Sequence, residues 1–159
     1  EHKPNFYEEA GRVPFIVSWK GVTRAGRVDE DHLVNASADL IPTMCDFAGI
    51  EPPAGRPGMS VRALAEGRAP SRWREHLVVE RYDGRMIRGD RYKYGIYDAP
   101  DLQQELYDLE RDPGEMHNLA GDPACSGILE RHRHRLQAWV NDYGDDYGRT
   151  CLRHAAPLT

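Results

Sequence analysis

Four short segments near the middle of the chain constrain its fold most strongly. Residues 77–82, 85–88, 92–97 and 105–109 are brief runs that contain apolar or aromatic side chains. The dipeptides Asp83-Gly84 and Gly89-Asp90, which separate the first three runs, are typical of tight turns. The pattern therefore predicts four short strands, the first three of which are joined as an antiparallel meander.

A helix is predicted after these strands. Asp122 is a suitable N-cap, and Pro123 suits the first helical position. The apolar side chains expected on its inner face are Leu129, Leu136, Val140 and Tyr143. Such a helix would pack across the meander, and the tail after residue 145 is expected to be weakly ordered.

The first part of the chain has a different pattern. The run from Val13 to Trp19 is almost continuously apolar, which predicts a strand covered on both faces. Asp39 is a suitable N-cap for a helix that ends at Gly49. A strand, a loop and a helix form half of an α/β unit. The Pro-, Gly- and Arg-rich residues 51–74 then mark the best internal boundary.

Charge and hydropathy exclude two classes of partner. The 159 residues carry a formal net charge of −5 with both signs mixed, so neither nucleic acid nor an anionic membrane surface is an expected partner. No apolar run approaches the roughly 20 residues of a membrane span, which predicts a soluble chain. Both a periplasmic or secreted and a cytoplasmic location stay open. Because the chain starts without Met, we expect it to be part of a longer one.

Nucleophiles and metal ligands are hard to assemble from this sequence. Cys45, Cys125 and Cys151 are too few and too scattered for a disulfide framework or a zinc site. None of the serines lies in a Gly-flanked nucleophile elbow. His132 and His134 are two residues apart on the predicted helix, so they are interpreted as solvated side chains and not as joint metal ligands. We expect no metal ligand in this chain.

The N-terminal residues are the best candidates for chemistry. His2 and Lys3 precede the predicted buried strand, where the loops of α/β proteins often form active sites. A Lys at this point can hold an anionic oxygen as a compact point charge. By spacing alone, Lys3 is more often a solvated terminal residue, and a flexible terminal side chain is the default interpretation of His2.

Three motifs lie in order along the chain. The first combines Lys3, Tyr7-Glu8 and Arg12-Val13-Pro14 with the apolar run that follows. The second combines Asp39-Leu40-Ile41-Pro42-Thr43 with Ala48-Gly49-Ile50. The third combines Arg91-Tyr92-Lys93-Tyr94, Glu105-Leu106-Tyr107-Asp108-Leu109, Asp112-Pro113-Gly114-Glu115 and Asn118-Leu119. In this order the motifs resemble the type I sulfatases of the alkaline-phosphatase-like superfamily.

The resemblance implies a sulfuric ester hydrolase that uses a formylglycine and a bound calcium. It also implies that Lys3 contacts the sulfate and balances charge on the transferring group. His2 is a second candidate, since a neutral imidazole near a leaving oxygen can donate a proton. The formylglycine motif and most metal ligands are absent from this chain, so calcium is expected in the complete enzyme and not here.

The resemblance also implies an architecture. Residues 1–74 would form the end of an alkaline-phosphatase-like α/β sandwich, and residues 75–145 a small antiparallel sheet packed with a C-terminal helix. Residues 146–159 would form the tail. The expected partners are a small-molecule or carbohydrate sulfate ester and the missing N-terminal part of the catalytic domain. A phosphonate or phosphodiester hydrolase and a non-catalytic interaction fragment are the alternatives.

Overall fold

The computed structural model describes residues 6–99 and 103–155 of the chain. Contacts divide the chain into two compact units. The sheet unit combines the described residues up to Ala10 with those from His76 onward, and the α2 unit comprises residues 11–75. Phe6 to Ala10 therefore belong with the C-terminal half of the chain and not with the residues that directly follow them.

Four antiparallel strands form the core of the sheet unit, in the order β1-β2-β3-β4. Their bounds are Leu77–Arg81, Gly84–Arg88, Tyr92–Tyr97 and Gln104–Asp108. Arg81 pairs with Gly84, so only Tyr82 and Asp83 form the first turn. Each strand pairs with the next one along the chain, which confirms the predicted meander.

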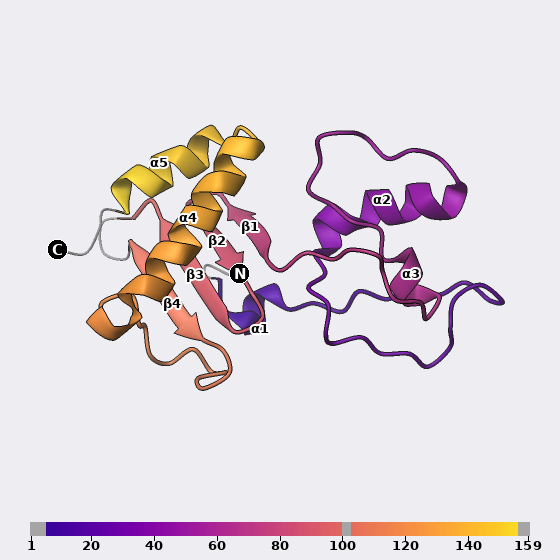
Figure 1. The fold of residues 1–159 in the computed structure, drawn as a ribbon, viewed down its shortest axis with the longest axis horizontal. Coiled ribbons are helices and arrows are strands. Elements are labelled where there is room, and N and C mark those ends of the chain that lie inside the picture. Colours follow the sequence, from indigo (N-terminus) through magenta and orange to yellow (C-terminus); the bar gives the residue numbers. More distant parts are fainter. Residues whose placement is uncertain (1–5, 100–102, 156–159) are drawn as a thin grey trace. The chain divides into compact units, whose positions relative to one another are not determined.

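Helices α4 (Ser126–Asp142) and α5 (Asp146–His154) cover one face of this sheet (Figure 1). A short 3-10 helix, η1 (Pro123–Cys125), leads into α4, and the Asp122 carboxylate caps it by accepting from the Ala124 amide at 2.9 Å. Side chains alternate between the two faces of a strand, so every second residue faces the helices. The apolar residues buried between sheet and helices include Ile87, Tyr94, Ile96, Leu106, Leu129, Leu136 and Val140.

Three expectations about this region are wrong. Tyr143 is exposed, and His132 takes its place among the buried residues of α4. His132 is therefore not solvated: its Nδ1 lies 2.8 Å from the Ile128 carbonyl, and burial lowers its pKa. Residues 146–154, expected to be a weakly ordered tail, form α5 because the Asp145 carboxylate caps the helix and its buried Cys151 and Leu152 join the core.

The α2 unit contains two helices, α2 (Ala36–Ala48) and α3 (Arg62–Ala65). The side chain of Asn35 caps α2 by accepting from the amides of Ser37 and Ala38, both at 3.1 Å. Gly49 ends the helix in the left-handed conformation, as predicted. Asp39 is therefore not the N-cap, since the helix begins three residues before it.

The predicted strand from Val13 to Trp19 is not formed. These residues have no regular secondary structure, and Ile16 is 85% exposed. A strand needs a neighbour to pair its backbone groups, and β1 to β4 pair only with one another.

In the described chain, no helix combines the length and apolar character that a membrane crossing requires.

Candidate functional site

The predicted site residues Lys3 and His2 lie outside the described residues, so their placement stays a prediction. The structure does describe the chain from Phe6 onward, including helix α1 (Glu8–Gly11). This segment lies on the sheet face opposite α4, where Phe6 forms a second small core with Met86 and Tyr97. The contacts that hold Phe6 and Glu8 therefore define the candidate site in the described residues.

Phe6 is buried on the sheet against Arg81, Gly84 and Tyr97, and we call this site the Phe6 seat. Its ring centroid lies 5.2 Å from that of Tyr97, and the Arg81 guanidinium lies 5.5 Å from the Phe6 centroid. Gly84 makes room for the ring, since a Cβ at this position would lie 3.1 Å from Phe6 Cε2 and 2.6 Å from the Ile96 carbonyl oxygen. The seat thus depends on the absence of a side chain at Gly84.

Lys93, on β3, holds the backbone of Phe6. Its side chain is only 2% exposed, and its Nζ donates to the Phe6 carbonyl at 2.7 Å. The same ammonium forms an ion pair with Glu115 and lies 3.5 Å from Glu8 Oε1. A buried ammonium is tolerated when it is paired and hydrogen-bonded, as it is here.

Glu115 reaches Lys93 from a tight turn. The Asp112 carboxylate accepts from the amides of Met116 at 3.1 Å and His117 at 2.8 Å, which fixes the turn. Glu115 has a φ of 53°, the only positive value at a non-Gly residue in the described chain. In this conformation, its carboxylate accepts from the Glu8 amide at 2.6 Å. The turn therefore aims one carboxylate at both the lysine and the N-terminal segment.

Arg88, on β2, completes the arrangement. Its Nε lies 3.2 and 3.3 Å from the two carboxylate oxygens of Glu8. We call Glu8, Arg88, Lys93 and Glu115 the Glu8 anchor. It contains two cations and two carboxylates, so its formal charges balance.

A hydrogen-bonded network lies beside the Glu8 anchor. The buried Glu105 carboxylate accepts from the Tyr97 hydroxyl at 2.7 Å and from the Tyr107 hydroxyl at 3.2 Å. Burial raises the pKa of both tyrosines, so the hydroxyls stay protonated donors at neutral pH. The network fixes Tyr97, and with it one wall of the Phe6 seat.

A family model matches most of the chain and shows the protein family to which it belongs. The model described as N-sulphoglucosamine sulphohydrolase, C-terminal, matches residues 2–142. The chain belongs to this sulfatase family. The match includes Phe6 and every residue of the Glu8 anchor, and it bears out the resemblance inferred from the three motifs.

Individual relatives agree with the family. The chain is 38% identical over 151 residues to a Delta 4,5-hexuronate-2-O-sulfatase of Bacteroides thetaiotaomicron, covering 90% of this chain and 31% of the relative. A solved structure of a 2-O GAG sulfatase is 37% identical, with a TM-score of 0.80, over 92% of this chain and 33% of that one. A phosphonate monoester hydrolase from Silicibacter pomeroyi is 29% identical with a TM-score of 0.56, over 68% and 25%. The chain thus spans about a third of the sulfatases that it matches.

The structure assigns physical roles to motif residues of this sulfatase family member. Lys93 and Glu115, which lie in separate segments of the third motif, meet in the Glu8 anchor. Sequence reasoning missed this pair, since their spacing along the chain gives no signal of contact. Lys93 is buried, and Arg91 forms an ion pair with Asp108.

Asp39 also has a structural role, but one different from a helix cap. Its fully buried carboxylate accepts from Arg74 at 2.8 and 2.5 Å, from the Met59 amide at 2.8 Å and from the Asn35 amide at 2.8 Å. Arg12 lies on the surface, 3.8 Å from Glu30. Both motif residues therefore take part in ion pairs within the α2 unit.

The stability of the fold is expected to depend on pH through the carboxyl group of Asp108. Its two hydrogen bonds from Arg91, at 3.0 and 2.6 Å, lower the pKa of the carboxyl to about 2. Because the folded pKa is below the unfolded one, near 3.9, the ionised carboxylate stabilises the fold above about pH 4. That contribution is lost as the pH falls toward 2.

The expected result for Asp108 is an NMR titration midpoint near 2 that moves up toward the ordinary carboxyl pKa of about 3.9 in Arg91→Met. Asp112, whose lowered pKa is caused by the Met116 and His117 amides, should keep its midpoint in this variant. An unchanged Asp108 midpoint would show that Arg91 does not control it.

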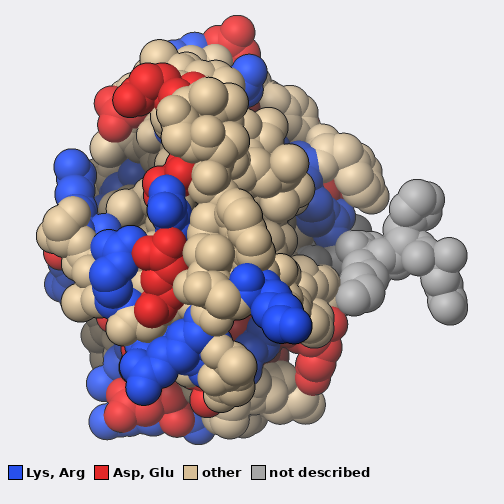
Figure 2. Space-filling model, turned by 90° about the vertical axis from the view of Figure 1, so that its right-hand side faces the viewer, with Lys and Arg blue, Asp and Glu red and all other residues tan. Residues whose placement is uncertain are grey.

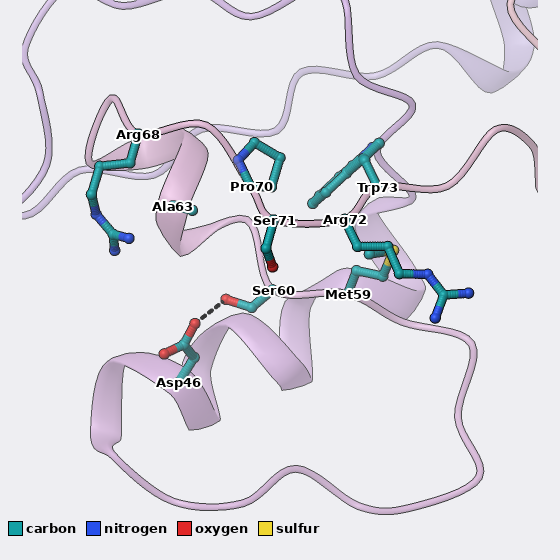
Figure 3. Close-up of a pocket in the computed structure, with 9 residues that line it drawn as sticks. All are labelled: Asp46, Met59, Ser60, Ala63, Arg68, Pro70, Ser71, Arg72 and Trp73. Carbon is teal, nitrogen blue, oxygen red and sulfur yellow. Dashed lines mark hydrogen bonds between the residues drawn. The ribbon is translucent and has the colours of Figure 1, made fainter.

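A hollow of about 410 Å³ lies in the α2 unit. The residues that line it are Asp46, Met59, Ser60, Ala63, Arg68, Pro70, Ser71, Arg72 and Trp73 (Figure 3). Ser60 donates to Asp46 at 2.6 Å, and the Arg68 guanidinium pairs with Glu66. Figure 3 shows Arg68 and Arg72 at opposite ends of the hollow, extended away from each other, so they do not converge on one ligand.

The residues that the structure describes do not fit a calcium ion. In residues 6–99 and 103–155, no three His, Cys, Asp or Glu side chains come together as a metal site. The carboxylates of the Glu8 anchor are already bound to Arg88 and Lys93. No chemical step is therefore assigned to a metal held by the described part of the chain.

Proposed function

We propose that this chain acts as the C-terminal part of a sulfatase that hydrolyses sulfate esters. The family match and the sulfatase relatives support this activity, and Lys3 is proposed to contact the sulfate group. A lysine ammonium stabilises negative charge that develops on a transferring group, provided that it is held in place. The observation that carries the proposal is the binding of Phe6 and Glu8, three and five residues after Lys3, to the residues of the Glu8 anchor.

The nucleophile and the calcium ligands are proposed to lie in a longer polypeptide that contains this chain. Helix α2 supports this proposal, because it buries Asp39 and Thr43 while exposing apolar side chains. The exposed apolar residues of the α2 unit include Ile16, Trp19, Leu40, Ile41 and Met44. Figure 2 shows uncharged surface between groups of charged side chains. An apolar surface of this kind is typical of an interface, here with the rest of a catalytic domain.

The substrate class is proposed to be a sulfated carbohydrate. The name of the Bacteroides thetaiotaomicron relative specifies a sulfate on a hexuronate, and the solved relative is a 2-O GAG sulfatase. His2 is retained as a proposed proton donor to the leaving oxygen. A matched set of 2-O-, 6-O- and N-sulfated sugars assayed with the complete protein would test the class and the preferred position.

The isolated chain is expected to hydrolyse no aryl sulfate, because it lacks the formylglycine motif. The complete polypeptide should turn over at a rate on the order of 1 per second or more. Lys3→Ala in the complete polypeptide should lower kcat/KM by about 100-fold or more, the scale of losing one charge-stabilising donor. Turnover by the isolated chain at the rate of the complete one would contradict the proposal.

One structural relative is a phosphonate monoester hydrolase, so hydrolysis of phosphonate monoesters is the second activity to test. The complete protein should be assayed in parallel on an aryl sulfate and on a phosphonate monoester with the same leaving group. A larger kcat/KM for the sulfate supports the sulfatase proposal, and a larger value for the phosphonate replaces it. Inactivity on both would favour the non-catalytic alternative.

A further inference from the structure

We propose that His132 makes the contact between α4 and the sheet sensitive to acid, so that α4 loosens when the imidazole takes up a proton. The proposal goes beyond the proposed function, because it concerns the fold of the sheet unit alone. The buried residues of α4 are Leu129, His132, Leu136 and Val140, at spacings of three and four. His132 therefore places an ionisable group on the stripe of the helix that is otherwise apolar.

The hydrogen bond of His132 determines which ring nitrogen would receive the proton. Its Nδ1 lies 2.8 Å from the backbone carbonyl oxygen of Ile128, one turn earlier in α4. A carbonyl oxygen only accepts, so Nδ1 of the neutral imidazole carries a hydrogen and donates it. Nε2 is consequently the nitrogen that is protonated in acid, and the ring becomes a cation while its bond to Ile128 is kept.

The surroundings of His132 disfavour this cation. The residue is 5% exposed, and its ring packs edge-to-face on Tyr92 of β3, with 6.0 Å between the ring centroids. Burial lowers the pKa of His132, whereas its hydrogen bond to the helix backbone acts in the opposite direction. Arg135 and Arg131 on α4 and His76 before β1 lower the pKa further, since each is a cation or becomes one in acid.

A carboxylate partner would offset these effects, and His132 has none in the part of the chain that the structure describes. His32, His134 and His154, by contrast, each pair with an aspartate or a glutamate. A buried charge without a partner is costly, so the fold avoids the charge either by keeping His132 neutral or by exposing it. Exposing His132 requires α4 to move away from the sheet.

The lowered pKa gives the direction of the pH dependence. An unfolded histidine has a pKa of about 6.5, and the folded His132 has a lower one. Below about pH 6.5, a state with α4 opened therefore binds more protons than the closed state. The stability contributed by the neutral ring is fully present above that pH. It is lost as the pH falls, by up to about 10-fold in the opening equilibrium per pH unit, until the folded His132 is itself protonated.

Arg133 would extend the loosening to α5. It follows His132 on α4, and its guanidinium donates to the carbonyl oxygens of Ala155 and of Leu152, the latter at 2.7 Å. Cys151 and Leu152 of α5 also belong to the core that contains Leu136. We therefore expect α4 and α5 to become less protected together in acid.

Hydrogen exchange in the 159-residue chain tests the proposal. The Leu136 and Val140 amides, corrected for the pH dependence of intrinsic exchange, report the opening equilibrium of α4. Wild type and His132→Leu, which cannot titrate at this position, would be compared at about pH 7.5 and about pH 5.5. Over this interval the opening constant should rise by up to about 10-fold more in wild type than in His132→Leu. A difference below about 2-fold would overturn the proposal.

His134→Leu is the matched control. His134 lies on the same helix, but its side chain is 80% exposed. This variant should keep the acid-dependent opening of wild type, because an exposed imidazole is protonated without a burial penalty. An equal loss of the pH dependence in His134→Leu and His132→Leu would assign the effect to the overall charge of α4 and overturn the proposal.

NMR titration of the wild-type imidazoles covers the case in which His132→Leu does not fold. The midpoint of His132 should lie below that of His134, as burial without a carboxylate requires. A His132 midpoint equal to that of His134, or above it, would overturn the proposal. Neither measurement involves a sulfate ester, so failure of the proposed function would leave both results unaffected.

Discussion

Asp39→Ala is expected to lower the free energy of unfolding of the α2 unit by about 3–5 kcal/mol, the scale for removing one partner of a buried ion pair. The substitution leaves the Arg74 guanidinium, which is only 11% exposed, without its carboxylate. It also removes the acceptor of the Asn35 and Met59 amides. Urea unfolding followed by tryptophan fluorescence would measure the loss, because Trp73 lies next to Arg74 in this unit.

Asp46→Ala is the matched control for Asp39→Ala. Both aspartates lie on α2, but Asp46 is partly exposed and its partner Arg62 lies at the surface. A clearly smaller loss of stability is expected, since exposed ion pairs contribute little. Equal losses for the two variants would mean that burial and pairing of Asp39 do not hold the unit together.

Leu136→Ala is expected to destabilise the sheet unit by about 2–5 kcal/mol, through lost burial and the cavity left behind. Leu136 is fully buried on α4, in the core with Ile87 and Tyr94. Arg135→Ala, at an exposed position of the same helix, changes helix propensity in a similar way without opening a cavity. Thermal unfolding followed by circular dichroism should separate the two, and similar midpoints would contradict the assignment of the core face.

The meander and α4 could be predicted from the sequence because their signals are local. Asp83-Gly84 specifies a tight turn, and the capping residue Asp122 marks the start of the helix within a few residues. The error at Tyr143 has a simple cause: periodicity alone does not reveal that the core ends one turn earlier, at Val140. His132 was missed because a polar residue on an apolar stripe was assigned to solvent.

Sequence reasoning wrongly predicted a strand from Val13 to Trp19 and missed the Glu8 anchor for a different reason. An apolar run predicts a strand only if other strands are present to pair with it, and this unit provides none. Lys93 contacts Phe6 across 87 positions of the chain, a separation that no local pattern specifies. The sequence therefore located the segment next to the proposed chemistry but not the residues that hold it.

The docking of Phe6 to Ala10 on the sheet turns the α2 unit into an insertion. Residues 11–75 leave the sheet unit and return to it, so both of their ends are tied to the same folded body. A single backbone cleavage in the Pro- and Gly-rich residues 51–58 would consequently not release the N-terminal piece at once. That piece would stay attached through Phe6 and Glu8 and also through Asp39, which binds Arg74 and the Met59 amide, so its dissociation after nicking requires both sets of non-covalent contacts to open.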